Sequence, residues 1–486
     1  MTESFYWYDL ETSGTDPRWD RVVQFAGFRT DANLEHIGDE QSFYVRLPDD
    51  VLPNPDASLV TGITPQRTHA EGVTEWQAMN RLQSLFSQPG TCAVGYNSLR
   101  FDDEFVRYGF YRNLRDPYAR EWQNGNSRWD LIDLVRAAGA LRREGINWPQ
   151  GDDGLPVYKL ELLTQANGLD HGQAHDALSD VQATVALARL IQRSQPRLFH
   201  YYFGLRFKKA VRQLLEPVGA AVCVHVSGMY PRAQYGTAPV VSVCRHPKNS
   251  NSVVVADLSQ DVEPLLSWSA ERIRESLFSR GASPRPPLKE IRINRCPFVA
   301  ELGVLTEENW SRLGFDAKLI KERHRRLGAP GIAQKIMKVY AGQTHEPPGD
   351  VDAALYDGFL QDEDRRRCES FVDALNEGRW TDLDYADARL GVLASRLKAR
   401  SFEQFLTADE ADEWSEFVAS KLSCEQSAWL NLNAFSARVT TLLDELDDNP
   451  DGVDRDRRRA VLLDLRRHGE HLSERYGQAP DTLSPT

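Results

Sequence analysis

Long hydrophobic runs are missing from this sequence of 486 residues. No apolar stretch approaches the ~20 residues that a membrane-spanning helix needs, and the polar start MTES lacks the apolar core of a signal peptide. With 41% hydrophobic and 27% charged residues, the composition is typical of globular proteins. These absences exclude an integral membrane protein, and we expect no membrane partner.

Cysteine is also scarce. The six cysteines stand far apart, and none forms the C-x-x-C spacing of a zinc or redox site. Scattered cysteines of this kind do not indicate a disulfide framework, so we expect reduced thiols and a cytoplasmic location.

Positive charge is in the minority, since 58 Lys and Arg face 71 Asp and Glu, for a formal net charge of −13. That balance argues against a nucleic-acid partner, but the charge is unevenly spread. Residues 196–349 hold 23 Lys and Arg against 13 Asp and Glu, a net charge of +10, whereas residues 1–195 carry −10 and residues 350–486 carry −13. A basic middle between acidic flanks is typical of a groove that follows a nucleic-acid backbone, and also of a solvated basic face.

The chain is too long for one compact core, and two to four domains are expected. Residues 1–195 alternate strand-like and helix-like patterns, which predicts an α/β domain on a mixed sheet. After the opening strand, the pattern predicts strands at 22–28, 42–48 and 91–98 and helices at 74–87 and 177–194.

Two further regions follow. Residues 196–349 contain β-branched runs broken by Gly, Pro and Asn, which predict a small strand-rich module; residues 281–290 are predicted to form a loop, and helical patterns return from 307 to 340. Residues 350–486 are predicted to form a helical C-terminal domain, with a disordered tail at 477–486.

The stretch FYWYDLETSG (5–14) places Asp9 and Glu11 two positions apart on a predicted buried strand. Residues i and i+2 point the same way on a strand, so the two carboxylates are expected to lie side by side. Two carboxylates this close either share a proton or bind a cation that neutralises both, and all-oxygen ligands suit Mg²⁺ or Mn²⁺. Alone, the pair is equally explained by a strand that runs out into a solvated turn.

More acidic residues follow at element ends. Asp102 comes just after the predicted strand TCAVGYNS, where a helix begins, and AHDALSDVQAT supplies His175 and Asp180. Asp102 by itself is an ordinary acid at a helix start, and His175 by itself is an ordinary loop histidine. Asp180 is less expected, since it falls in the first turns of a strongly apolar helix.

Together, D-x-E, N-x-x-x-F-D and H-x-x-x-x-D occur in the order that resembles the DEDDh family of 3′→5′ exonucleases, which have a ribonuclease H-like fold. The resemblance implies that Asp9, Glu11, Asp102 and Asp180 hold two divalent ions, Mg²⁺ or alternatively Mn²⁺, at the scissile phosphate, which Glu11 also contacts. It assigns His175 as the general base that takes a proton from water.

The rest of the chain is similar to the bacterial exonuclease I family in the stretches NSRWDLIDLVRA, GINWPQGDDGLP, HVSGM, INRCP and VDAALYDGF. That resemblance implies a DEDDh exonuclease domain (1–195), an SH3-like DNA-binding module (196–349) and a helical C-terminal domain (350–486). The implied activity is degradation of single-stranded DNA from its 3′ end to 5′-mononucleotides, in DNA repair and recombination. The implied partners are single-stranded DNA and the acidic C-terminal tail of single-stranded DNA-binding protein, and we expect a monomer.

A single-strand nuclease needs cations for phosphates and aromatic faces for bases. The family pattern places such contacts at Arg107, Tyr118, Trp122, Arg136, Arg142, Lys159, Lys208 and Asn294. Lys159 stands where the family has Arg, which keeps the charge but loses the bidentate fork. Tyr118 and Trp122 could equally be core residues, and each Arg could be a solvated surface charge.

Two other functions remain open: a DEDDh exonuclease that acts on RNA or a proofreading substrate, and a non-catalytic scaffold that binds single strands. Nothing in the chain resembles a polymerase, and all five catalytic positions are filled, so both alternatives explain less of the sequence.

Overall fold

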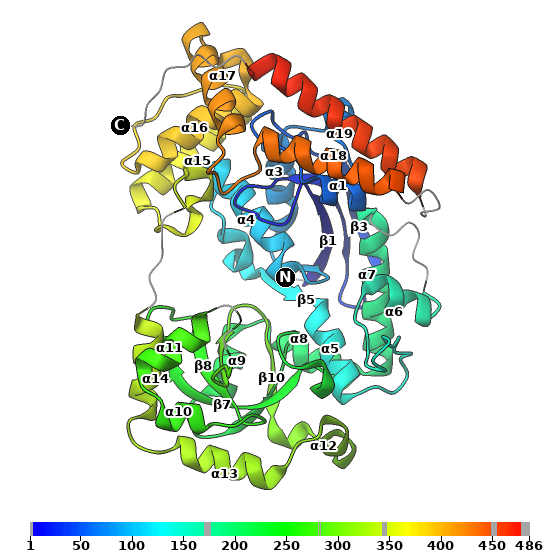
Figure 1. The fold of residues 1–486 in the computed structure, drawn as a ribbon, viewed down its shortest axis with the longest axis vertical. Coiled ribbons are helices and arrows are strands. Elements are labelled where there is room, and N and C mark those ends of the chain that lie inside the picture. The colour runs from blue at the N-terminus through cyan, green and yellow to red at the C-terminus, as the bar shows by residue number, and fades with distance from the viewer. Residues whose placement is uncertain are drawn as a thin grey trace.

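The computed structural model describes residues 3–169, 176–279, 281, 283–342, 348–448 and 454–477. Its strands form two five-stranded sheets, one in the first part of the chain and one in the middle, and helices surround both (Figure 1). Within these described residues, no helix combines the length and the apolar character that crossing a membrane requires.

The first sheet has the strand order β3-β2-β1-β4-β5. Its strands are β1 Ser4–Thr12, β2 Val22–Thr30, β3 His36–Tyr44, β4 Thr91–Gly95 and β5 Ser127–Asp130. β1 is antiparallel to β2, which is antiparallel to β3, whereas β4 runs parallel to β1 and to β5. The sheet is therefore mixed, as the sequence predicts, and β1 is its central strand.

The aromatic run at the start of β1 is buried on both faces of the sheet. Phe5 and Trp7 belong to one hydrophobic core, and Tyr6 and Tyr8 belong to another on the opposite side. Because successive side chains of a strand point to opposite faces, a continuous apolar run is expected where helices cover both sides. α3 and α4 pack on the Tyr side, and α5 and α7 pack on the Trp side.

The helices of the first region are α1 Pro55–Thr61, α2 Pro65–Glu71, α3 Glu75–Phe86, α4 Asp102–Arg112, α5 Leu131–Leu141, α6 Leu160–Ala166 and α7 Ala177–Ser194. Those of the middle region are α8 Pro196–Gly204, α9 Lys208–Leu215, α10 Glu263–Ser267, α11 Ala270–Phe278, α12 Glu307–Leu313, α13 Ala317–Leu327 and α14 Ile332–Ala341. Those of the last region are α15 Asp362–Asn376, α16 Ala388–Ser401, α17 Ala408–Ser423, α18 Leu432–Asp448 and α19 Arg455–Tyr476.

The second sheet is antiparallel throughout, in the order β10-β6-β7-β8-β9. Its strands are β6 Val222–Val226, β7 Thr237–Arg245, β8 Ser252–Asp257, β9 Leu288–Arg292 and β10 Phe298–Glu301. α10, α11, α13 and α14 cover one side of it with a core of their own. The other side faces the first region, so the predicted strand-rich module is present.

One hydrophobic core crosses the junction near residue 195. Trp129 of β5 is fully buried, and its ring lies 5.2 to 5.6 Å from the rings of Phe199, Tyr202 and Phe203 of α8. The same core continues to Phe298 of β10. The first and middle regions are therefore joined by shared packing as well as by the chain.

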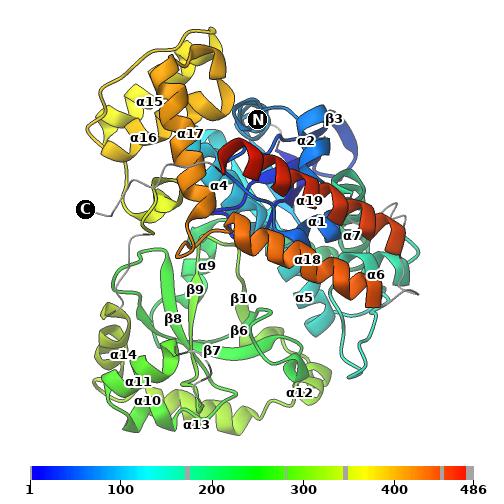
Figure 2. The same cartoon turned by 45° about the horizontal axis from the view of Figure 1, so that its top comes forward.

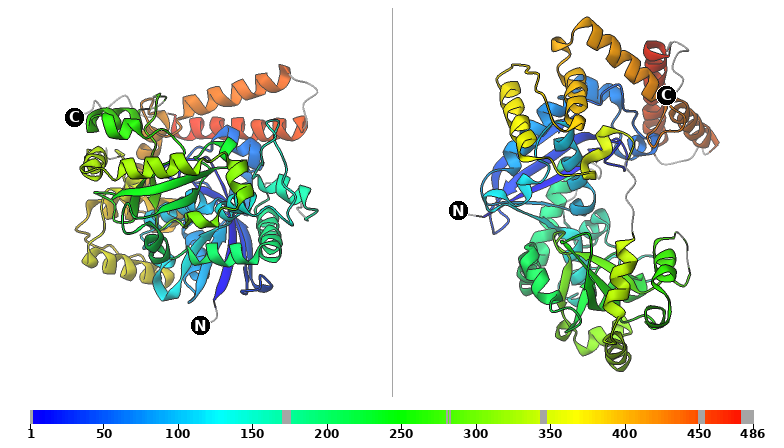
Figure 3. Two further views of the ribbon diagram at one scale, coloured as in Figure 1. Left: turned by 90° about the horizontal axis from the view of Figure 1, so that it is seen from below. Right: turned by 90° about the vertical axis from the view of Figure 1, so that its left-hand side faces the viewer.

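The last region folds back over the first. α18 and α19 run side by side, and α19 packs against α1 and α2 (Figures 2 and 3). A short 3-10 helix, η6 (Val351–Tyr356), inserts against α4 and α16. α19 ends at Tyr476, and the predicted disordered tail lies outside the described residues except for Gly477.

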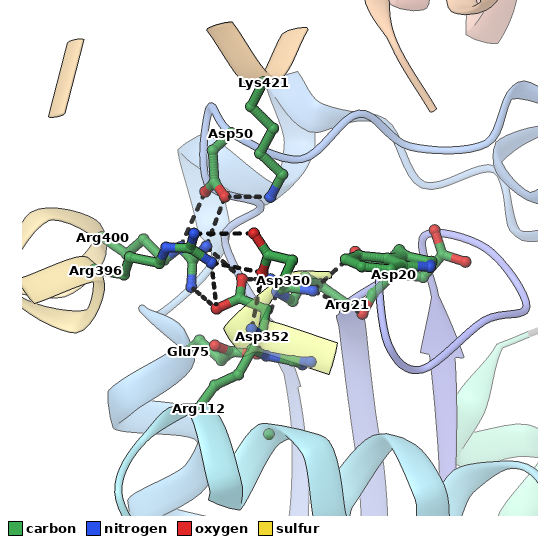
Figure 4. A network of polar contacts seen from close by, with 12 residues as sticks. Asp20, Arg21, Asp50, Glu75, Arg112, Asp350, Asp352, Arg396, Arg400 and Lys421 are labelled. Atoms are coloured by element: carbon green, nitrogen blue, oxygen red, sulfur yellow. Dashed lines mark hydrogen bonds and ion pairs between the residues drawn. The ribbon is translucent and has the colours of Figure 1, made fainter. Parts of the chain in front are cut away.

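A buried network of ion pairs joins the first and last regions (Figure 4). Asp50 accepts hydrogen bonds from Arg400 at 2.6 Å and from Lys421 at 2.7 Å. Asp352 of η6 accepts from Arg400 at 2.6 Å and from Arg21 at 2.9 Å. Buried charges of this kind are tolerated only when each has partners, and the pKa of Asp352 is held well below its usual value because three arginines and Lys421 offset its desolvation.

The helices predicted at 74–87 and 177–194 are confirmed. The strand predicted at 42–48 has wrong bounds, because β3 covers His36–Tyr44 and shares only residues 42–44 with the prediction. β3 is an edge strand whose residues are mostly exposed or half-buried, so it lacks an apolar pattern. Leu47, which suggested a strand, is buried in a small core with Val51 and Ile63. Similarly, β9 begins at Leu288, inside the loop predicted at 281–290.

Candidate metal centre and active site

Three carboxylates meet at the end of the central strand. Asp9 and Glu11 of β1 and Asp180 of α7 each offer an oxygen atom, and these atoms lie within 4.8 Å of one another. Glu11 is buried, and the other two are half-buried. The i, i+2 spacing on β1 thus places two acids on one face, as the sequence predicts, and α7 adds the third.

Local structure fixes the position of each acid. In the β1–β2 ladder Asp9 lies opposite Ala26 and Glu11 opposite Gln24, and an irregularity in register follows Glu11. Asp180 falls in the first turn of α7, whose N-cap is Asp176. The Gln24 side chain reaches Asp176 at 3.5 Å, so β2 also touches the start of the helix that carries Asp180.

Asp102 lies next to this cluster but on a different element. It is the first residue of α4, it is buried, and its Oδ1 accepts a hydrogen bond of 3.2 Å from the backbone N–H of Leu10. That contact places Asp102 directly beside Asp9, and its charge helps to raise the pKa of Asp9.

Burial and mutual repulsion both oppose ionisation here. Desolvation, followed by the charges of Asp9, Asp180 and Asp176, raises the pKa of Glu11 to about 9. The pKa values of Asp9 and Asp102 are raised well above the usual range, with desolvation as the main cause. A group of buried carboxylates that repel one another fits a hard divalent cation, which would return them to the ionised state.

Two further acids, which no sequence motif indicates, support α4. Asp103 is buried and accepts charged hydrogen bonds from Arg120 and Arg128, and Asp130 accepts from the backbone N–H groups of Asn97 and Leu99. Together they hold the turn that leads into Asp102. The doubled acid in LRFDDEF was the only signal in the sequence for this support.

The predicted general base, His175, lies outside the described residues, which resume at Asp176.

The predicted aromatic contacts occupy different settings. Trp122 is 66% exposed, so its ring is available to a ligand. Tyr118 is half-buried, with the Arg107 guanidinium 5.4 Å above its ring and the Phe359 ring 6.5 Å away. Phe359 itself is 84% exposed. Their role as DNA contacts stays a prediction.

Several predicted cationic contacts already have protein partners. Arg107 is buried between Glu104 and Glu121, Arg136 pairs with Asp133 at 2.8 Å, and Arg142 donates to the backbone oxygens of Leu141 and Val304. Lys159 and Lys208 are exposed, and Asn294 is half-buried. These contacts too stay predictions.

Comparison with family models divides the chain in the same order. Residues 6–188 match an exonuclease model, residues 206–342 match the exonuclease I SH3-like domain, and residues 349–472 match the exonuclease I C-terminal domain. These matches confirm the predicted fold class. Exonucleases of the first family depend on divalent metal ions, consistent with the carboxylate cluster.

Similar proteins cover nearly the whole chain. Exodeoxyribonuclease I of Escherichia coli is 41% identical over 420 residues, which is 85% of this chain and 88% of that protein. The crystal structure of E. coli exonuclease I in complex with a dA16 oligonucleotide superposes with a TM-score of 0.91 at 38% identity, covering 97% of this chain and all of the other. A crystal structure of SSB/exonuclease I with the inhibitor CFAM gives a TM-score of 0.88 at 37% identity, with the same coverage. The chain therefore belongs to the exonuclease I family, and it is an exonuclease.

Proposed function

We propose that this protein degrades single-stranded DNA from its 3′ end and releases 5′-mononucleotides. The observation that carries the proposal is the meeting of Asp9, Glu11 and Asp180 within 4.8 Å, with Asp102 beside them. The likeness to exonuclease I structures that hold DNA oligonucleotides supports single-stranded DNA as the substrate.

The four carboxylates would hold two Mg²⁺ ions. When bound, such ions polarise the scissile phosphate and lower the pKa of water. The protein's own contribution is to keep the four acids converged at one end of the sheet, where Glu11 also faces the substrate. His175, assigned by resemblance, takes the proton of the attacking water as a general base.

The strand would reach this site past aromatic and cationic side chains. Trp122 and Tyr118 offer faces on which bases of any sequence can stack. Arg136, Lys159, Lys208 and Asn294 would contact the backbone, together with Arg107 and Arg142 after exchange of their present partners. The +10 net charge of residues 196–349 supports a path along the middle region.

We propose the acidic tail of single-stranded DNA-binding protein as a protein partner, on the strength of the SSB/exonuclease I structure. A groove of about 860 Å³ lies between α8 and β10, and Arg197 and Tyr201 are among its lining residues. A cation beside an exposed aromatic ring suits an acidic peptide. Arg197→Glu should weaken binding of such a peptide, measured by fluorescence anisotropy, and leave nucleotide release unchanged.

We further propose that the enzyme acts as a cytoplasmic monomer with regions bounded near residues 195 and 349. The six cysteines all lie among the described residues and none is paired there, which supports a reducing compartment.

Digestion of matched substrates tests the proposed function. With Mg²⁺, single-stranded DNA should be shortened from its labelled 3′ end, whereas duplex DNA and RNA of the same sequence should persist. EDTA should stop cleavage but leave strand binding. Equal digestion of RNA would favour the alternative substrate, and binding without cleavage at any metal concentration would favour a scaffold.

A further inference from the structure

The loop of residues 13–21 connects the strand that carries Asp9 and Glu11 to β2. Its two ends are tied together, because Ser13 N–H donates to Arg21 O at 2.8 Å and Arg21 N–H donates to Ser13 Oγ at 2.9 Å. Ser13 O also accepts from the Asn54 N–H at 2.6 Å. Ser13 is only two residues beyond Glu11, so this loop sets where the metal-binding end of β1 lies.

The far side of the same loop is held by the C-terminal region. Arg21 and Asp352 form an ion pair of 2.9 Å, and each side chain is no more than 2% exposed. Trp19, also in the loop, packs its ring 5.2 Å from that of Trp429. Two independent contacts from residues beyond 350 therefore reach the loop that follows the catalytic strand.

Asp352 is itself immobilised. It pairs with Arg400 at 2.6 Å and with Arg396 at 3.1 Å, both from α16 (Figure 4). On the other side, Arg21 lies near Glu75 at 3.7 Å. Without Asp352, the buried Arg21 guanidinium would face Arg112 and Arg400 with less compensation, and the loop would have to move to rehydrate it.

We propose that Asp352 and Trp429 are positioning residues for the carboxylate centre, which they reach through Arg21, Trp19 and the loop 13–21. The inference rests on the proposed function. The C-terminal region then takes part in shaping the active site. Metal binding by carboxylates is sensitive to such outer contacts, whose loss typically costs 10- to 100-fold in affinity or activity.

Three variants test this, with one matched control. Arg21→Gln and Asp352→Asn remove the buried pair. Trp429→Leu removes the ring that packs on Trp19 but keeps the Arg21–Asp352 pair, although the same ring also lies 5.9 Å from Lys421 Nζ. Asp56→Asn is the control, because its exposed pair with Arg438 at 2.6 Å joins the same two regions but does not touch the loop. The readouts are Mn²⁺ affinity, by electron paramagnetic resonance of the free ion, and kcat and KM on a single-stranded DNA trinucleotide.

We expect each of the three variants to lose about tenfold or more in Mn²⁺ affinity and in kcat, with KM nearly unchanged, while Asp56→Asn matches the unaltered protein. If Asp352→Asn fails to fold, Trp429→Leu decides the question. Folded Arg21→Gln and Trp429→Leu proteins with unaltered Mn²⁺ affinity and kcat would overturn the inference. So would a defect seen only on long strands, since the region would then act on the strand away from the metal centre.

A different result would refute the proposed function. If the unaltered protein cleaves single-stranded DNA of no length, that function is refuted, and the Mn²⁺ affinities still decide whether the loop positions the carboxylates.

Discussion

Glu11 is held where both burial and its neighbours oppose its charge. An isolated glutamate would avoid such a position, so the site is stable in the ionised form only with a cation between the acids. This balance of forces leads to two predictions about single residues.

Asp9→Asn and Asp180→Asn should each lower the rate of nucleotide release by more than ~100-fold, because each removes a carboxylate ligand. The melting temperature in EDTA should not fall, since each change relieves repulsion. Mononucleotide release and circular dichroism measure the two effects, with Asp152→Asn, an exposed acid, as the control. Activity above a tenth of the unaltered rate would remove the residue from the site.

The metal-free protein should lose stability as the pH rises from about 5 to 9. Glu11 has a native pKa of about 9 against 4.5 when unfolded, so the folded state binds the extra proton in this range. A group whose pKa is raised in the folded state contributes its full stabilisation below its unfolded pKa. That contribution is lost as the pH rises towards the pKa of the folded state. Mg²⁺ should therefore raise the melting temperature more at pH 8.5 than at pH 5.5, and Glu11→Gln should flatten the EDTA profile. A melting temperature that Mg²⁺ does not change at either pH would contradict this prediction.

At the scale of elements, prediction succeeded where burial gives a clear period. α7 carries a long apolar face and was predicted at its observed bounds, 177–194. Most of β3 was missed because HIGDEQSFY is a polar edge strand, which forms by pairing with β2 and not by burying its own side chains. The convergence of the four acids could be predicted because the motifs that carry them occur in a recognisable order along the chain. The support from Asp103 and Asp130 could not, because it depends on contacts between residues that are distant in sequence.

α19 supplies a prediction at this scale. His468 is buried in the helix, and desolvation lowers its pKa to about 4, with Asp49, His69 and His471 as its charged neighbours. Because this pKa is lowered in the folded state, the contribution of His468 to stability is fully present above the unfolded pKa of 6.5. That contribution is lost as the pH falls below 6.5, by up to about 3 kcal/mol. With Mg²⁺ bound, His468→Leu should therefore reduce the drop in melting temperature between pH 7.5 and pH 5. An unchanged drop would contradict the prediction, because it would mean that protonation of His468 does not contribute to the loss of stability at low pH.

For the whole molecule, the shared core determines what can be separated. A fragment of residues 1–195 loses Phe199, Tyr202 and Phe203 from the surface of Trp129. Deleting one buried aromatic ring costs about 3–5 kcal/mol, and a typical domain is stable by only about 5–15 kcal/mol. The fragment should therefore melt far below the full chain or not fold, as measured by circular dichroism. A fragment of residues 1–342, which keeps this core, is the control, and a cooperative transition of fragment 1–195 near that of the full chain would contradict the prediction.

The ion pairs between the first and last regions were beyond the reach of sequence analysis. Arg21 and Asp352 are 331 residues apart, and Lys421 and Asp50 are 371 apart. Each reads in sequence as an ordinary surface charge, because its partner can be recognised only after the chain has folded.

The same separations bear on the order of events during synthesis. Arg21 leaves the ribosome 331 residues before its partner Asp352, and Trp19 precedes Trp429 by a still longer stretch of chain. Contacts between such distant residues form late, since chain closure must precede them. A nascent or prematurely terminated chain that lacks Asp352 and Trp429 would therefore hold its acids in an unfinished arrangement. Under the proposed positioning role, the chain would cut DNA only once its last region has been made and has packed against the first.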